Sequence, residues 1–141
     1  ITDEEVENYF KFTFVRNPFA RLVSAWRGFT QKGKAVREFE SFVVNTGPGH
    51  LFYDDGEFTN DHWFPQCNYT QFSDGESFID FIGKFEQLAI HTNLLSEKVK
   101  FAGFAVRENT IKSYKEHYEN GLENIVANIY KKDLELFGYE F

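Results

Sequence analysis

Methionine is absent from the sequence, and cysteine occurs once, at position 67. Because Ile1 is therefore not a translational start, we expect the chain to be a fragment or a processed product. One cysteine excludes an internal disulfide framework and a cysteine-rich zinc site. No stretch approaches the roughly 18 consecutive apolar residues of a membrane helix, and the N-terminus lacks the basic and then apolar pattern of a signal peptide. We expect any membrane anchor to lie outside this chain.

The composition that remains is typical of one folded domain. The chain has 141 residues, of which 42% are hydrophobic and 26% charged, and most of its aromatic residues are the 18 phenylalanines. A chain of this length buries roughly two thirds of its unfolded surface on folding. Disordered, collagen-like and low-complexity proteins are excluded. No repeat or linker divides the sequence, so we predict a single domain, itself partial, over residues 1–141.

Charge is unevenly distributed along the chain. The net charge is −7 and the pI is about 5.1, which argues against general binding to nucleic acid or to anionic membranes. Residues 11–37, however, hold seven basic residues and no acidic one. This basic stretch is either a local anion site or a solvated helix face, and the spacing alone favours neither.

A strand, a tight turn and a helix are predicted around Arg16. Residues 9–15 are dense in aromatic and β-branched side chains, which is typical of a short buried strand. Asn17 and Pro18 are the expected N-cap and first-turn proline of a helix that we expect Gly28 to close. The apolar stripe of this helix is formed by Phe19, Leu22, Val23 and Trp26.

The rest of the sequence predicts further helices, one long loop and a second strand. The expected elements are a helix near 36–43, a loop over 47–77, a buried strand ending at Phe85, a helix over 86–98, two helices from Thr110 that break near Asn120 and Gly121, and an apolar tail at 134–139 that docks on the body. Strands that alternate with helices form parallel sheets, so the predicted fold class is α/β.

Arg16 and Ser24 are the candidate residues of an anion site. Ligands of parallel α/β proteins gather beyond the carboxyl ends of the strands, where Arg16 is expected. The helix N-terminus that follows offers backbone N–H groups and a positive dipole end to phosphate or sulfate. Ser24 lies roughly 9 Å further along the helix, on the face away from the apolar stripe. The alternatives are a surface ion pair for Arg16 and a hydroxyl bonded to the preceding turn for Ser24.

Four segments, in order along the chain, resemble a known family. They are residues 14–26 (FVRNPFARLVSAW), 61–66 (DHWFPQ), 80–86 (DFIGKFE) and 129–139 (IYKKDLELFGY). Together they resemble the sulfotransferases that use 3′-phosphoadenosine 5′-phosphosulfate (PAPS), in the carbohydrate sulfotransferase branch. The resemblance implies a P-loop-NTPase-like parallel sheet flanked by helices, of which this chain holds the C-terminal portion. It also implies an enzyme that transfers a sulfuryl group from PAPS to a hydroxyl of a carbohydrate or related acceptor.

The resemblance assigns four residues to PAPS. It implies that Arg16 and Ser24 hold the 3′-phosphate and that Phe85, at the end of the second strand, lies against the adenine. Lys112 falls in a region from which members of the family often send further phosphate contacts. The alternatives are a core position for Phe85 and a solvated helix start for Lys112.

Two features depart from the family pattern. Members carry a second, lysine-bearing loop near their N-terminus that grips the 5′-phosphosulfate, and the residues before Arg16 contain no such loop. Members from the animal Golgi often have a cysteine pair after the His-Trp segment, whereas this chain has only Cys67. We therefore favour a bacterial cytoplasmic location over the Golgi lumen or membrane.

A hydroxyl acceptor needs a base near its proton, and His62 is the candidate within this chain. It lies in a loop rich in turn residues and aromatics, and Glu86 is the second candidate. A structural histidine that bonds its own loop is the alternative for His62. Sulfuryl transfer, like phosphoryl transfer, relies mainly on positioning and charge stabilisation, so no metal is required. Four histidines without metal-ligand spacing predict no zinc site.

Two other functions remain open from the residues. Since the 5′ loop is missing, the chain could bind adenosine 3′,5′-bisphosphate or a sulfated glycan without catalysis. It could also bind nucleic acid through the basic stretch, although the acidic remainder argues against this. The expected partners are therefore a nucleotide co-substrate and a carbohydrate or small hydroxyl acceptor, and the oligomeric state does not follow from the sequence.

Overall fold

The computed structural model describes residues 8–31, 38–46, 62–100 and 114–141. The chain forms two compact units. The sheet unit comprises Ile1–Arg16 and Asn68–Asn109, and the helical unit comprises Asn17–Cys67 and Thr110–Phe141. Much of the predicted loop over 47–77 lies outside the described residues.

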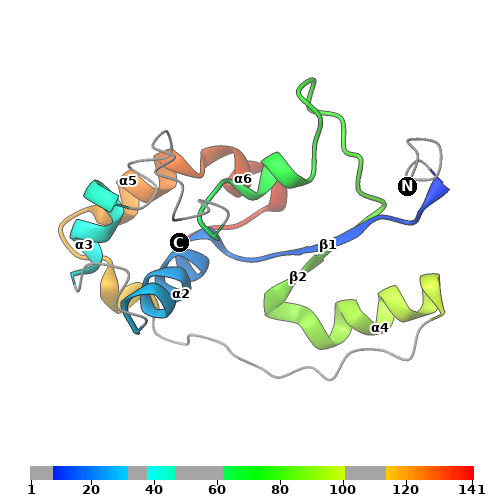
Figure 1. The fold of residues 1–141 in the computed structure, drawn as a ribbon, viewed down its shortest axis with the longest axis horizontal. Helices are drawn as coiled ribbons and strands as arrows, with labels where there is room; N and C mark the ends of the chain where they lie inside the picture. Colours follow the sequence, from blue (N-terminus) through cyan, green and yellow to red (C-terminus); the bar gives the residue numbers. More distant parts are fainter. Residues whose placement is uncertain (1–7, 32–37, 47–61, 101–113) are drawn as a thin grey trace. The chain divides into compact units, whose positions relative to one another are not determined.

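The sheet unit is built on two parallel strands (Figure 1). β1 (Phe12–Val15) pairs with β2 (Phe81–Lys84), with the first residues of the two strands opposite each other. A 3-10 turn, Phe85–Gln87, follows β2 and leads into α4 (Leu88–Val99), which packs against β2. Parallel strands joined through helices confirm the predicted α/β class.

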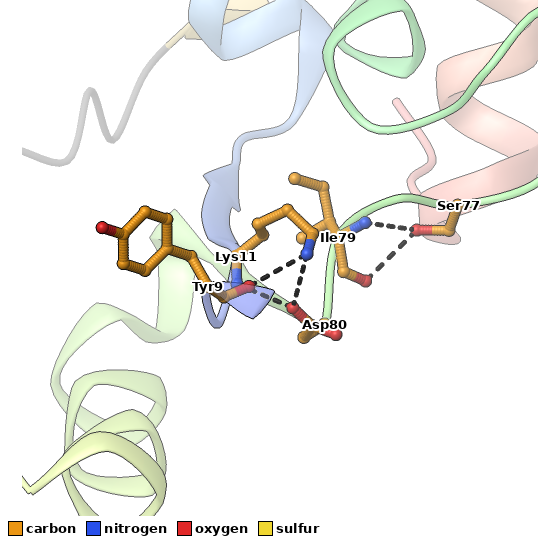
Figure 2. Close-up of polar contacts among 5 residues, drawn as sticks. All are labelled: Tyr9, Lys11, Ser77, Ile79 and Asp80. Atoms are coloured by element: carbon orange, nitrogen blue, oxygen red, sulfur yellow. Dashed lines mark hydrogen bonds and ion pairs between the residues drawn. The ribbon is translucent and has the colours of Figure 1, made fainter. Parts of the chain in front are cut away.

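Polar contacts at the amino ends of the strands form what we call the register lock (Figure 2). The Lys11 backbone N–H donates to Asp80 Oδ2 at 2.7 Å, and Lys11 Nζ lies 3.7 Å from the same oxygen. Lys11 Nζ also donates to Tyr9 O at 2.9 Å. Just before Asp80, the Ser77 hydroxyl bonds both the N–H and the carbonyl of Ile79, each at 3.2 Å. The start of β2 is thereby tied to the start of β1 on both sides of one carboxylate.

The lock determines which residues meet at the other end of the sheet. Lys11 O accepts hydrogen bonds from the backbone N–H groups of Asp80 and Phe81, at 2.8 and 3.2 Å. A slip of one residue would turn every side chain of a strand to the opposite face of the sheet. Arg16 lies as far beyond Lys11 as Phe85 lies beyond Asp80, so the locked register brings these two residues to matching positions.

The helical unit encloses a hydrophobic core rich in aromatic residues. Its elements are α2 (Pro18–Gln31), α3 (Phe39–Ser41), a π-helical turn (Phe42–Thr46), a 3-10 turn (Tyr114–His117), α5 (Leu122–Ile129) and α6 (Lys131–Phe137). The fully buried members of the core include Phe19, Leu22, Val23, Phe42, Val43, Val126 and Tyr130. None of the described helices is long and apolar enough to span a bilayer.

The chain break and the docked tail agree with the sequence prediction. Asn120 and Gly121 take left-handed φ angles of 55° and 78°, and α5 begins directly after them. At the C-terminus, the Phe141 ring packs edge-on against the rings of Phe19 and Tyr118, with centroids 4.9 and 5.3 Å apart. The tail therefore closes the core over the start of α2.

Two expectations are wrong in detail. β1 is half-buried, because Phe12 is 41% exposed and only Val15 is fully buried. Gly28 does not close α2, which continues to Gln31. A glycine inside a helix costs only about 1 kcal/mol relative to alanine, and the packing of Phe29 against the core favours the continued helix.

Two glycines offer a matched test of this packing. A Cβ at Gly83 would lie 2.5 Å from Phe14 Cε1, whereas a Cβ at Gly28 would meet no atom within 4 Å. We predict that Gly83→Ala lowers the free energy of unfolding by about 1–3 kcal/mol, because the Phe14 ring must leave its place against Phe81. Gly28→Ala should raise it by about 0.5–1 kcal/mol. Thermal unfolding of the full-length protein measures both, and shifts of the same sign would contradict the described packing.

Candidate functional site

The carboxyl ends of β1 and β2 bring two of the predicted cofactor residues together. Arg16 directly follows β1, Phe85 directly follows β2, and the Arg16 guanidinium carbon lies 4.8 Å from the centroid of the Phe85 ring. Both side chains are half-buried. A guanidinium that stacks on an aromatic face directs its N–H donors outward in its own plane, where they suit bidentate pairing with phosphate. The strand ends thus place a phosphate-binding group beside an aromatic ring.

The end of β2 has a further anchor that the sequence did not reveal. The Lys84 backbone N–H donates to His91 Nδ1 at 2.6 Å, which ties the last residue of β2 to α4. His91 had no motif around it and was expected to be a surface residue. Its contact instead helps to fix the strand end from which Phe85 projects.

The start of α2 follows the prediction closely. Asn17 Oδ1 accepts a hydrogen bond from the Phe19 N–H at 3.0 Å, as an N-cap does. Asn17 Nδ2 donates to Glu140 O at 2.9 Å, so the same side chain also holds the C-terminal tail. Ser24 lies on α2 and is half-buried. The structure therefore places Ser24 in the helical unit, whereas Arg16 and Phe85 belong to the sheet unit.

Most described members of the basic stretch bond to protein groups. Lys11 belongs to the register lock, and Arg21 Nη1 donates to a backbone carbonyl at 2.6 Å. Arg27 Nη2 donates to His117 Nε2 at 2.8 Å, and burial together with the charge of Arg27 lowers the pKa of His117. The three remaining basic residues lie outside the described part of the chain. The stretch is therefore not one continuous anion surface, and Arg16 differs from the others by its aromatic partner.

His62 is exposed at the start of the segment 62–67. Its ring packs edge-on against Phe29, with centroids 5.2 Å apart. The next residue, Trp63, is buried, and its ring packs against Phe29 and Phe42 at 5.2 and 5.4 Å. An imidazole that is open to solvent, beside a buried neighbour that fixes its backbone, is suited to proton transfer with an incoming ligand.

The same segment is held by a residue that the sequence analysis missed. The fully buried carboxylate of Asp133 accepts the backbone N–H groups of Gln66 at 2.7 Å and of Cys67 at 2.8 Å. Burial and the nearby Asp133 raise the pKa of Cys67 to about 11, so the thiol keeps its proton at neutral pH. The available signal was an acidic residue within the apolar stripe of the predicted helix at 129–139.

The other candidates are less informative. Lys112 lies outside the described residues. Glu86 is exposed in the 3-10 turn after β2. Across the described ranges, no three His, Cys, Asp or Glu side chains form a group that could hold a metal ion.

Comparison with known proteins defines the class of this chain. A family model described as the sulfotransferase family matches residues 1–140, so the chain belongs to the sulfotransferase family. Carbohydrate sulfotransferase 14 is similar over 117 residues, at 29% identity in Mus musculus and 31% in Danio rerio, covering 67% of this chain in each case. Carbohydrate sulfotransferase 11 from Mus musculus is 29% identical over 175 residues that cover 97% of this chain.

The matches also limit what this chain represents. It covers 30% and 31% of the two carbohydrate sulfotransferase 14 sequences and 49% of carbohydrate sulfotransferase 11. No solved structure matches the chain. The relatives are vertebrate proteins, and they give no support to the expected bacterial cytoplasmic location.

The two roles of Asn17 can be separated by substitution. Asn17→Ala removes both the cap of α2 and the bond to the tail, and we predict a loss of about 1–2 kcal/mol in the free energy of unfolding. Asn17→Ser keeps a cap acceptor and should lose less. Denaturant unfolding of the full-length variants measures the difference, and equal losses would show that the cap contributes nothing.

Proposed function

We propose that the full-length protein transfers a sulfuryl group from PAPS to a hydroxyl of a carbohydrate. The observation that carries this proposal is the contact between Arg16 and Phe85 at the ends of two parallel strands, in a chain that belongs to the sulfotransferase family. The names of the relatives favour a carbohydrate acceptor. The finer description of the fold, a P-loop-NTPase-like sheet, is part of the same proposal.

In this proposal the chain binds the 3′-phosphate and the adenine of PAPS. Arg16 pairs with the 3′-phosphate through its N–H donors, and Phe85 provides an aromatic surface for the base. Ser24 adds a hydroxyl to the phosphate, and Lys112 adds a second cation. The stacking of Arg16 on Phe85 supports this, because a pre-ordered guanidinium loses less conformational freedom when it binds.

Catalysis requires one proton transfer at the acceptor. His62 takes the proton from the acceptor hydroxyl while that oxygen attacks the sulfur of PAPS, and the bond from sulfur to the phosphate oxygen breaks in line. The products are a sulfate ester, adenosine 3′,5′-bisphosphate and protonated His62. We assign the charge on the departing phosphate oxygen to groups outside this chain, since no lysine-bearing loop precedes Arg16 here.

The alternatives are less well supported. The relatives are named as sulfotransferases, which favours an enzyme over a binding module. Nucleic-acid binding through the basic stretch is disfavoured, because Arg21 and Arg27 already bond to protein groups. For the location we now favour the Golgi over the bacterial cytoplasm, since the relatives come from animals.

The nucleotide site is tested by two arginines from the same basic stretch. We predict that Arg16→Ala weakens binding of adenosine 3′,5′-bisphosphate to the full-length protein by about 2–5 kcal/mol, since a charge-assisted contact is lost. Arg27→Ala removes the same charge from α2 and should leave the affinity unchanged. Ser24→Ala should cost about 1 kcal/mol. Titration calorimetry measures all three, and equal losses for Arg16→Ala and Arg27→Ala would reduce the effect to net charge.

The base is tested by turnover. We predict that His62→Ala lowers kcat about 100-fold or more while the affinity for adenosine 3′,5′-bisphosphate stays the same, because a general base acts on the acceptor and not on the nucleotide. Glu86→Gln should retain turnover. Transfer of labelled sulfate from PAPS to a glycan panel measures both, and the opposite pattern would identify Glu86 as the base.

A further inference from the structure

The buried carboxylate of Asp133 acts as a distant cap for the segment that carries His62. The 3-10 helix Gln66–Tyr69 begins directly after Pro65, whose side chain has no acceptor for the first N–H groups. Asp133 supplies both acceptors from α6, with one oxygen for each N–H. Because Asp133 is 0% exposed, any shift of the segment would leave a buried charge unpaired, which is costly.

Two more side chains hold the carbonyls of the same segment. The Tyr130 hydroxyl donates to Trp63 O, and Arg21 Nη1 donates to Phe64 O at 2.6 Å. Burial raises the pKa of Tyr130, so the hydroxyl keeps the proton that it donates. Four consecutive hydrogen-bonding positions of the backbone, on either side of Pro65, are thus fixed from helices α2 and α6 and their flanking residues.

The spacing of these contacts fixes the segment along its length. Tyr130 and Asp133 lie three residues apart on one helical turn and therefore share a face. They contact Trp63 and Gln66, which are also three residues apart. A shift of the segment by one residue would break both contacts at once. His62 directly precedes Trp63, so its backbone begins from this fixed point.

We propose that Asp133 and Tyr130 are positioning residues, which set where the His62 imidazole stands during sulfuryl transfer. This inference rests on the proposed role of His62 as the base. Neither residue touches the substrate in this account. Their effect is to hold the imidazole within the narrow range of positions from which a proton can be taken, since displacements of about 1 Å can lower a rate roughly 100-fold.

Matched variants of the full-length protein test the proposal. Asp133→Asn places an amide donor against a backbone donor, and Tyr130→Phe removes only the hydroxyl. The control for Tyr130 is Tyr118→Phe, because Tyr118 is also a buried tyrosine, and it donates to a backbone carbonyl of α2 at 2.9 Å instead. The control for Asp133 is Glu135→Gln, an exposed carboxylate on the same helix.

Two readouts are expected to change together. The rate kcat should fall about tenfold or more in Asp133→Asn and Tyr130→Phe, with the KM for PAPS unchanged, while both controls retain kcat even where Tyr118→Phe lowers the Tm. Labelling of the Cys67 thiol, followed by mass spectrometry of its own peptide, should become about tenfold faster in Asp133→Asn, since the capped N–H groups are released and the thiolate fraction rises.

Three outcomes would overturn the proposal. Unchanged labelling of Cys67 in Asp133→Asn would mean that the carboxylate does not hold the segment. Faster labelling with unchanged kcat would mean that the segment is held but that its position does not govern the reaction. Equal loss of kcat in Tyr118→Phe and Tyr130→Phe would reduce both effects to general stability. If the unsubstituted protein shows no sulfuryl transfer, the proposed function fails, and the labelling result still decides whether Asp133 holds the segment.

Discussion

The register between β1 and β2 is the constraint on which the nucleotide site depends. Lys11 and Asp80 fix it at the amino ends of the strands through backbone and side-chain contacts to one carboxylate. At the carboxyl ends, the same register places the Arg16 guanidinium over the Phe85 ring. Neither residue of the lock needs to touch a ligand, because it acts by determining which side chains meet at the end of the sheet.

The four segments that resemble sulfotransferases form two pairs of contacting segments in the structure. Within the sheet unit, the strand that opens 14–26 pairs with the strand of 80–86. Within the helical unit, the segment 61–66 is bonded by Tyr130 and Asp133 of 129–139. The spacing of chemically distinctive residues within each segment therefore has a physical reason. One pair presents a cation beside an aromatic ring, and the other holds an exposed imidazole on a fixed backbone.

Local features of the chain could be predicted from the sequence, whereas features that depend on distant partners could not. The Asn17 cap and the break at Gly121 follow from the residues themselves and are confirmed. The end of α2 was misplaced at Gly28, because the packing of Phe29 on the core outweighs a glycine's weak preference. The role of Asp133 depends on N–H groups 67 residues away, and no local pattern encodes such a pairing. The roles of Ser24, His62 and Lys112 stay predictions.

The central claim is that the end of this sheet binds the 3′-phosphate and the adenine of a nucleotide. A crystal structure of the full-length protein with adenosine 3′,5′-bisphosphate tests it most directly. The account predicts the 3′-phosphate within hydrogen-bonding distance of the Arg16 guanidinium and the adenine in contact with the Phe85 ring. A bound nucleotide that contacts neither residue, with the guanidinium still stacked on the ring, would contradict it.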